Sequence, residues 1–228
     1  MAPTPDITLY FLGASRAIRI AWLLEELSLP YNLEVSPRAS NGLASPEFKA
    51  KIPTLLGKSP AVKDGDIVVQ ESSAIAEYLC ETYDTQGRVL PREPKARAKV
   101  REFMAAAEGT FMLHALPILY ARWRLPKPAA EYLPEMEKGL SANVHNDLNW
   151  LEAELSDGKE GGGGETNKFL VGNTLSAADI LMGFSIEFIF TRKLGTDGGN
   201  WPRVQRWLDG IRESESYKRA VEKTGYSL

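Results

Sequence analysis

Cysteine is nearly absent from this sequence. Its 228 residues contain one, Cys80, and only two histidines, His114 and His145. A single cysteine excludes an intramolecular disulfide framework and fits a reducing compartment. Neither histidine has a thiol or carboxylate clustered near it at ligand spacing, so we expect no metal site.

A strong charge excess and a long apolar run are also lacking. The net charge of -3 gives no broad field to attract nucleic acid or an anionic membrane. No apolar run approaches the ~20 residues needed to span a bilayer. The first residues, MAPTPDITLYF, lack the basic segment and apolar core of a secretory signal. We therefore expect a cytoplasmic protein with no nucleic-acid partner and no membrane span.

The first third of the chain alternates strand and helix patterns. Residues Ile7 to Leu12 form a β-rich apolar run, and a helical pattern from Arg16 stops at Pro30. Residues Tyr31 to Val35 then alternate like a second strand. This order predicts a βαβ unit with a right-handed crossover.

Two short strands and a helix complete this region. We expect strands at Thr54–Leu56 and Ile67–Val69, separated by turn-forming residues, and a helix over Ser72–Thr82. The order β-α-β, loop, β-β-α is that of a thioredoxin-like fold. We assign residues 5–84 to this domain.

The second half shows helical patterns only. Residues 84–93 are polar and rich in turn formers, so we place a boundary there and assign 94–228 to an all-helical domain. Pro117 predicts a kink or early end in its first long helix. Ser176 and Asp179 have the spacing of a capping box. Gly161–Gly164 predict a surface loop, since no strand leads into them and no Gly-Lys-Ser/Thr follows.

The most informative stretch lies between Lys51 and Leu79. If the bond before Pro53 is cis, it exposes the backbone of Ile52 to a peptide-like ligand. Glu71 offers a carboxylate to an ammonium group, and Ser72 opens a helix whose N-terminus favours an anion. Lys51 would meet a second carboxylate. Together they predict a slot for a small zwitterionic peptide; the alternative is a hairpin followed by a capped helix.

These residues resemble the glutathione-binding half of the cytosolic glutathione transferase superfamily. The matching segments are Lys51-Ile52-Pro53-Thr54-Leu55 and Gln70-Glu71-Ser72-Ser73-Ala74-Ile75. In that family the proline is cis, the residue before it pairs with the cysteinyl backbone of glutathione, and the Glu-Ser pair holds the γ-glutamyl end. The phrase from Ser15 to Leu27 looks most like serine-containing microbial members.

The resemblance implies a fold and further site residues. The fold is an α/β N-terminal thioredoxin-like domain plus an all-α C-terminal helical domain, usually in a homodimer. Glutathione is the co-substrate, with no metal. In this family a long helix of the second domain walls the electrophile pocket, which makes Phe111, His114 and Arg122 candidates for the second-substrate site. The alternative for these three is an ordinary packed or partly exposed helix face.

A thiolate needs a group that lowers the thiol pKa from about 8.5. The family carries its donor just after the first strand, where this chain has Ser15, with Arg16 as an electrostatic alternative. Ser15 also has the position of a helix cap, and the two roles are compatible. Tyr10 is a rival donor, although its place inside the strand favours core packing. Cys80 lies near the end of a helix, which disfavours a cysteine-type mechanism.

We therefore expect a glutathione transferase that conjugates the glutathione thiolate to small hydrophobic electrophiles in detoxification, with some hydroperoxide reduction. The alternative is a non-catalytic glutathione-binding or ligand-carrier protein, or a regulatory protein, on the same fold. A glutathione-dependent isomerase ranks last, because the double-serine and cysteine pattern of those members is missing. The sequence leaves open the electrophile and the dimer geometry.

Overall fold

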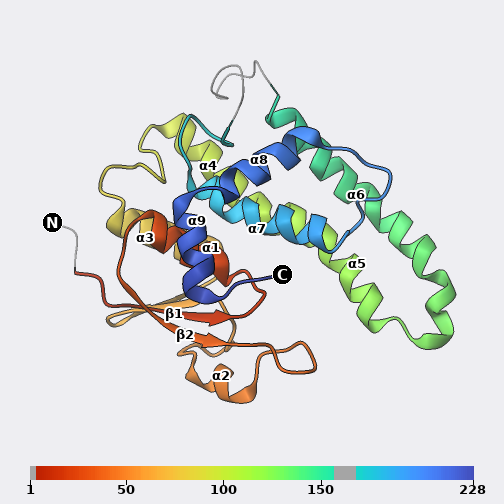
Figure 1. The fold of residues 1–228 in the computed structure, drawn as a ribbon, viewed down its shortest axis with the longest axis horizontal. Coiled ribbons are helices and arrows are strands. Elements are labelled where there is room, and N and C mark those ends of the chain that lie inside the picture. The colour runs from red at the N-terminus through yellow and green to blue at the C-terminus, as the bar shows by residue number, and fades with distance from the viewer. Residues whose placement is uncertain (1–3, 157–167) are drawn as a thin grey trace. The chain divides into compact units, whose positions relative to one another are not determined.

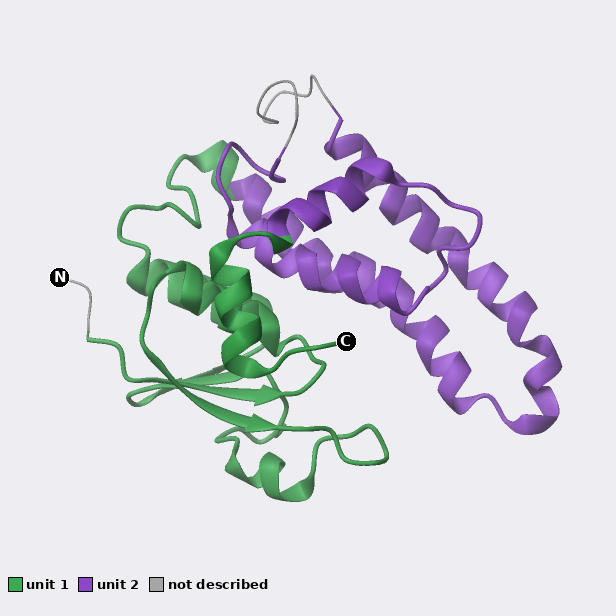
Figure 2. Ribbon diagram, in the orientation of Figure 1, with its two compact units in different colours: residues 1–97, 212–228 green, residues 98–211 purple. Residues whose placement is uncertain are grey.

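The structure, a computed structural model, describes residues 4–156 and 168–228 (Figure 1). The predicted Gly161–Gly164 loop lies outside the described residues. The chain divides into two compact units, shown in Figure 2. The first comprises residues 1–97 and 212–228, and the second comprises residues 98–211. This division differs from the expected 94–228 domain, because the last helix packs with the first unit.

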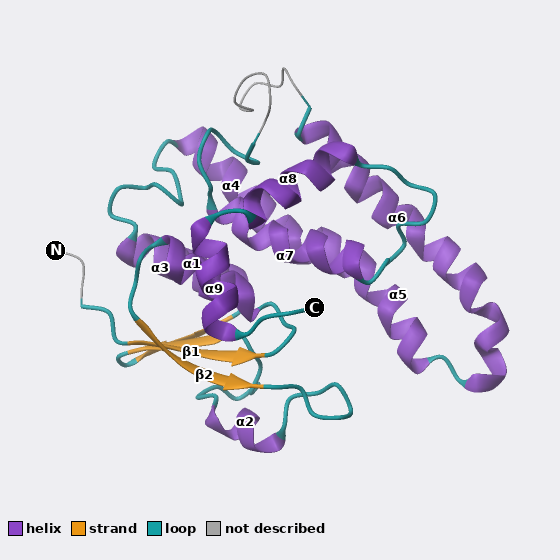
Figure 3. Ribbon diagram, in the orientation of Figure 1, coloured by secondary structure: helices purple, strands orange, loops and turns teal. Residues whose placement is uncertain are grey.

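A mixed four-stranded sheet forms the centre of the first unit (Figure 3). The strand order is β2-β1-β3-β4, with β1 at Ile7–Leu12, β2 at Tyr31–Ser36, β3 at Ala61–Asp64 and β4 at Ile67–Gln70. Strands β1 and β2 are parallel, as the βαβ prediction requires, whereas β3 and β4 run antiparallel to their neighbours. The predicted thioredoxin-like arrangement is confirmed.

Helices cover both faces of this sheet. Figure 1 shows α1 (Ala17–Glu26), α3 (Ser72–Tyr83) and α9 (Glu215–Thr224) on one side and α2 (Pro46–Lys51) on the other. The first eight residues of α1 are all buried, because the helix is enclosed by the sheet and α9. The α2 face is filled by an apolar cluster: Tyr10, Leu12, Phe48, Ile52 and Ala61.

The prediction of a strand at Thr54–Leu56 is wrong. These residues form a turn after α2, in which Gly57 N–H donates to the carbonyl of Thr54, and Leu55 is fully exposed. The third strand is instead Ala61–Asp64. A two-residue connection, Gly65-Asp66, sets Asp64 opposite Ile67, and its Gly65 adopts a φ of +55° that a side chain disfavours.

Helices make up the regular structure of the second unit, as predicted, in the part of the chain that is described. Their bounds are α4 Pro94–Ala106, a π-helical stretch Ala107–Met112, α5 Leu113–Arg124, a 3-10 stretch Lys127–Tyr132, α6 Leu133–Glu154, α7 Ala177–Thr191 and α8 Pro202–Arg212. Helix α5 does not end early at Pro117. The π-helical stretch precedes it, a type of irregularity that adds a residue to a helical turn.

The predicted capping box is present at the start of α7. The Asp179 carboxylate is fully buried and accepts from the backbone N–H groups of Ser176 and Leu170 at 2.9 and 2.8 Å. It also accepts from the indole N–H of Trp207 at 2.9 Å. The structural role expected for Asp179 is confirmed.

One expectation about apolar runs needs correction. The continuous helical segment Pro94–Arg124 contains an 18-residue window with a mean hydropathy of 1.2, which is long and apolar enough to cross a membrane. Half of that window is buried inside the structure. The core helix of a soluble protein meets the same criterion, so this segment is weak evidence for a membrane span.

Candidate functional site

Three loops meet at one edge of the sheet in the first unit. Tyr10 pairs with Ala61, and Ala61 pairs with Gln70. The C-terminal end of β1, the start of β3 and the end of β4 therefore lie side by side. The segments that continue from them are Gly13–Arg16, Ser59-Pro60 and Glu71-Ser72, so the strand register brings the candidate donor loop and the Glu-Ser pair to the same edge.

The hydroxyl of Ser15 holds the loop Gly13–Arg16 in place. Ser15 is 7% exposed, and its Oγ donates to the carbonyl of Leu12 at 2.7 Å and accepts from the N–H of Ala17 at 3.2 Å. Gly13 N–H donates to the Ser36 carbonyl at 2.8 Å. The Ser15 hydroxyl therefore satisfies one N–H at the start of α1, although the N-cap residue itself is Arg16. Arg16 follows directly and is partly exposed.

The proline at this edge is Pro60. Among the described residues the cis peptide bond is Ser59–Pro60, so the prediction that placed it at Ile52–Pro53 is wrong. Ile52 ends α2, where its N–H donates to Lys49 at 3.2 Å and its carbonyl accepts from Thr54 at 2.8 Å. Both backbone groups of Ile52 are therefore engaged within the chain, and its side chain is 4% exposed.

Sequence reasoning missed Ser59. Its hydroxyl donates to the Tyr10 carbonyl at 2.8 Å and accepts from the Leu12 N–H at 3.0 Å. A signal was available: a two-residue hairpin loop before Ile67 places the partner strand at 61–64, and a proline is tolerated at the first residue of a strand. That reasoning selects Pro60 over Pro53.

Glu71 has an unusual backbone. Its φ of 73° and ψ of 124° lie in a region that non-glycine residues rarely adopt, and it is the N-cap of α3. Its carbonyl accepts from the Ile75 N–H at 2.9 Å, and its side chain is exposed. Ser72 follows as the first helical residue and is 5% exposed. The 12-residue helix directs its first N–H groups and positive dipole end to this edge.

Lys51 lies at the end of α2 and is exposed. Its Nζ is 3.0 Å from Oε2 of Glu34 on β2. A carboxylate ligand at Lys51 would therefore replace or join this exposed ion pair, which contributes little to stability.

The second-substrate candidates make internal contacts of the second unit. Phe111 is fully buried and packs against Trp150 at a ring-centroid distance of 6.0 Å. His114 Nδ1 is 2.7 Å from Oδ2 of Asp147. Burial raises the pKa of the Asp147 carboxyl, and the His114 hydrogen bond partly offsets this rise.

Arg122 is also engaged. Its guanidinium donates to both carboxylate oxygens of Glu137 at 2.8 Å and to the carbonyls of Arg192 and Lys193 at 2.7 and 2.9 Å. These hydrogen bonds of Arg122 join α5 to α6 and to the segment after α7. The packed-helix alternative accounts for the contacts of Phe111 and Arg122.

Cys80 and Tyr10, the alternatives to Ser15 and Arg16, both have a raised pKa. Burial raises the pKa of the Cys80 thiol to about 12, so this cysteine stays protonated at neutral pH. Burial, with Glu34 nearby, raises the pKa of the Tyr10 phenol. Tyr10 is 8% exposed within the α2-side cluster, as core packing predicts.

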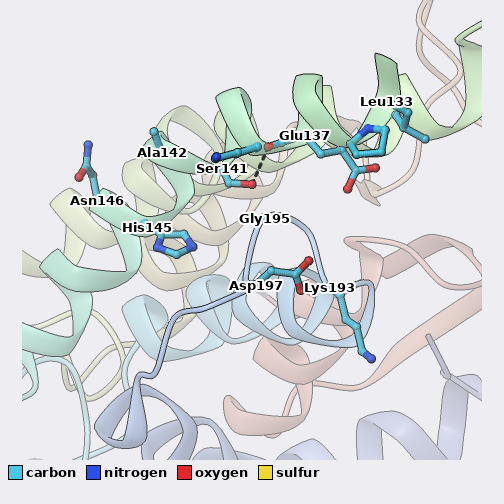
Figure 4. A pocket seen from close by; sticks show the side chains of 11 residues that line it. Leu133, Glu137, Ser141, Ala142, His145, Asn146, Lys193, Gly195 and Asp197 are labelled. Atoms are coloured by element: carbon cyan, nitrogen blue, oxygen red, sulfur yellow. Dashed lines mark hydrogen bonds between the residues drawn. The ribbon is translucent and has the colours of Figure 1, made fainter. Parts of the chain in front are cut away.

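The second unit contains an open cavity of about 690 Å³, shown in Figure 4. It lies between α6 and the segment after α7, and its lining includes Glu137, Ser141, His145, Lys193 and Asp197. None of the residues at the sheet edge lines it. The described residues contain no group of three His, Cys, Asp or Glu side chains that could hold a metal ion.

Comparisons with known proteins show the family to which the chain is related. Residues 5–81 match the family model "Glutathione S-transferase, N-terminal domain", and residues 111–215 match "Glutathione S-transferase, C-terminal domain". Glutathione S-transferase 1 of Saccharomyces cerevisiae is 28% identical over 240 residues, which cover 96% of this chain and 95% of the relative.

Solved structures show the same relationship. A glutathione S-transferase from Actinobacillus pleuropneumoniae is 31% identical, with a TM-score of 0.75 over 97% of this chain and 94% of that one. A glutathione transferase homologue from Lodderomyces elongisporus, solved with two glutathione molecules per subunit, has a TM-score of 0.73 at 19% identity, covering 96% of this chain and 98% of that one. The chain therefore belongs to the glutathione S-transferase family and is a glutathione transferase.

Proposed function

We propose that glutathione binds at the sheet edge formed by Ser15, Ser59, Glu71 and Ser72. The backbone of Glu71 is the observation that carries this proposal. A non-glycine residue held at φ 73° costs about 1–3 kcal/mol, and such residues cluster at ligand clamps. The conformation places a carboxylate directly before the N-terminus of α3, so one short segment offers both an anion and an anion-binding site.

The charged groups at the γ-glutamyl end of glutathione match the Glu71-Ser72 pair. The γ-glutamyl ammonium pairs with the Glu71 carboxylate, and the neighbouring carboxylate binds Ser72 and the first N–H groups of α3. Ser59 takes the role predicted for Ile52, pairing its backbone with the cysteinyl residue. Lys51 remains the candidate for the glycyl carboxylate.

The reaction is attack of the glutathione thiolate on a small hydrophobic electrophile. A carbon–sulfur bond forms, and the leaving group departs with its electron pair. Ser15 or Arg16 stabilises the thiolate, and the binding site holds both reactants together. With a hydroperoxide, two glutathione thiols become a disulfide while the peroxide is reduced to an alcohol and water. A cytoplasmic homodimer, as the resemblance implies, completes the proposal.

The first experiment measures glutathione binding by calorimetry for wild type and for Glu71→Ala and Glu71→Gln. Loss of a charge-assisted contact should raise the Kd by about 10-fold or more in both variants. Asp66→Ala is the matched control, because Asp66 is an exposed acid at the opposite end of β4. An unchanged Kd in both Glu71 variants would place the γ-glutamyl end elsewhere.

Measuring conjugation activity distinguishes a glutathione transferase from a non-catalytic ligand carrier. Wild type should conjugate glutathione to a chlorodinitrobenzene-type probe. Binding without turnover on several electrophiles would favour a non-catalytic glutathione-binding protein, and an absence of binding would contradict the site itself.

A further inference from the structure

The turn between β1 and α1 has a disfavoured backbone conformation at Ala14. Its φ of 49° lies in the left-handed region, which a residue with a Cβ atom adopts only at a cost. Such conformations persist where surrounding contacts hold them, and they cluster at functional sites. Ala14 directly precedes Ser15 and Arg16, the two candidates for stabilising the thiolate. The contacts that hold Ala14 therefore help to decide where these two side chains lie.

Arg38, on the segment after β2, supplies one of these contacts. Its Nη2 donates to the Ala14 carbonyl at 2.9 Å, and its Nη1 donates to the Gly42 carbonyl at 2.8 Å. The planar guanidinium carries its donors in a fixed fork, so it holds two carbonyls at once in a defined geometry. The Gly13 N–H also donates to the Ser36 carbonyl at 2.8 Å. The end of β2 and the segment after it thus hold both Gly13 and Ala14.

The other carbonyl that Arg38 contacts belongs to a closed turn. The Gly42 N–H donates to the Ala39 carbonyl at 2.8 Å, and the Ala39 N–H donates to the Leu43 carbonyl at 2.8 Å. Gly42 has a φ of 77°, which glycine adopts readily. The guanidinium therefore connects Ala14 to a turn of defined shape.

We propose that Arg38 is a positioning residue for the reaction: its guanidinium holds the Ala14 backbone in the left-handed conformation that presents Ser15 and Arg16 to the thiol of glutathione. This inference rests on the proposed function, because it assumes that glutathione lies at this edge of the sheet. Arg38 acts through the Ala14 carbonyl and does not contact the reacting sulfur.

Loss of the guanidinium should let this turn relax. Without the Arg38 contact, Ala14 can return to a negative φ, and the rotation moves Ser15 and Arg16 away from the thiol. The thiolate then loses stabilisation, so the pKa of the bound thiol rises, while the contacts of the γ-glutamyl end with Glu71 stay in place. The effect should thus appear in the thiol pKa and in kcat more than in the Kd.

Arg38→Met and Arg38→Lys test the proposal. Methionine keeps an unbranched chain without a donor, and lysine keeps the charge without the fork. In both variants the pKa of the bound glutathione thiol, measured from the ultraviolet absorbance of the thiolate, should rise by about one unit. At a pH below that pKa, kcat should fall by about 10-fold with the thiolate fraction, and the glutathione Kd should stay within about 3-fold of wild type.

Arg88→Met is the matched control. Arg88 is also exposed, and its guanidinium also donates to a backbone carbonyl, that of Glu26, at 2.6 Å. Glu26 is the last residue of α1, so this contact lies at the end of the helix away from Ser15. Its removal should leave the thiol pKa and kcat unchanged.

A glycine at position 14 provides a rescue test. Glycine adopts a positive φ as readily as a negative one, so Ala14→Gly removes the cost of the conformation that Arg38 holds. When Ala14→Gly is added to Arg38→Met, kcat should recover by about 3-fold or more relative to Arg38→Met alone. No recovery would contradict a role that acts through the Ala14 backbone.

Amide hydrogen exchange supplies a readout without activity. The Gly13 N–H should lose protection in Arg38→Met and keep it in Arg88→Met. Thermal unfolding of each variant gives the fraction folded, by which the rates are corrected.

The outcomes separate this inference from the proposed function. If wild type fails to bind glutathione, the proposed function falls and this inference falls with it. If wild type binds and Arg38→Met keeps the thiol pKa and kcat of wild type, the positioning role is overturned while the proposed function stands. A Kd raised by about 10-fold or more with an unchanged thiol pKa would also overturn it, because Arg38 would then bind the ligand itself. So would an Arg38→Lys variant equal to wild type, since charge alone would then suffice.

Discussion

At the residue scale, the Ser15 hydroxyl fixes a turn and is also a proposed thiolate donor. Its Oγ donates to Leu12 and accepts from Ala17, so it fixes the turn between β1 and α1. A thiolate stabilised by the same hydroxyl would compete with the Leu12 carbonyl for its single proton. Arg16 beside it carries a positive charge, which stabilises a thiolate without using the Ser15 proton.

Replacing Ser15 by alanine should distinguish these tasks. Loss of the hydrogen bond from the Ala17 N–H at the start of α1 should lower the free energy of unfolding by about 0.5–2 kcal/mol. If the hydroxyl also stabilises the thiolate, kcat for conjugation should fall by about 10-fold or more while the glutathione Kd stays within about 3-fold. Urea unfolding, calorimetry and steady-state kinetics measure the three quantities.

Ser15→Thr is the control, since it keeps a hydroxyl at this position. An alanine variant that loses stability but keeps its rate would assign thiolate stabilisation to Arg16 or water, and leave Ser15 as a cap alone.

At the element scale, one carboxylate ties α3 to the sheet. Asp64, the last residue of β3, accepts from the hydroxyls of Tyr78 and Tyr83 on α3 at 2.9 and 2.5 Å. Its other oxygen accepts from the Asp6 N–H at 3.0 Å. Because Glu71 and Ser72 begin the same helix, these contacts help to fix the helix whose start lies at the proposed binding edge.

The two tyrosines predict a loss of stability in alkali. Burial and the Asp64 hydrogen bond raise the pKa of Tyr78 to about 12, and the same causes raise the pKa of Tyr83. A raised folded-state pKa means that the unfolded chain releases its protons first. The contribution of the two tyrosines to the free energy of unfolding should therefore be complete below about pH 10 and decline as pH rises towards about 12.

Urea unfolding across this pH range measures the effect. The double variant Tyr78→Phe, Tyr83→Phe should show a smaller decline than wild type, and the exposed Tyr132→Phe should match wild type. Equal declines in all three proteins would mean that the tyrosine–Asp64 contacts do not control alkaline stability.

At the scale of the whole molecule, the chain ends in the unit where it begins. Helix α9 packs on α1, and the Trp22 indole N–H donates to Ser216 Oγ at 3.0 Å. Ser216 in turn donates to Glu26 at 2.6 Å. Trp22 is 2% exposed and Ser216 is 4% exposed. The last helix is therefore part of the first unit's core.

Removing this serine should destabilise the first unit. Ser216→Ala leaves the buried Trp22 N–H without its acceptor, which should cost about 1–3 kcal/mol of unfolding free energy. Lys218→Ala, on the same helix, removes only exposed ion pairs and should cost less than about 1 kcal/mol. Denaturant unfolding followed by tryptophan fluorescence tests both, and equal effects would contradict the buried role of Ser216.

The amino-acid sequence by itself determined the strand–helix–strand start, the helical second half, the capping box at Ser176 and Asp179, and the family. These features rest on local periodicity, cap spacing and motif residues, which can be read within a short window. The Glu71-Ser72 pair was also found this way, since it stands directly before a helical pattern.

Only the tertiary structure decided which proline stands at the sheet edge beside Glu71, how the Glu71 backbone is held, and that α9 belongs with the first unit. A four-residue strand such as β3 is too short for its period to separate it from the apolar run at Leu55, so in the sequence only the spacing of the hairpin loop at Gly65-Asp66 favours Pro60 over Pro53. Pairing with β1 resolves them, because Ala61 fits opposite Tyr10 while Ile52 is taken up by the end of α2. Contacts between residues far apart in the chain, such as Trp22 with Ser216, leave no local pattern from which to predict them.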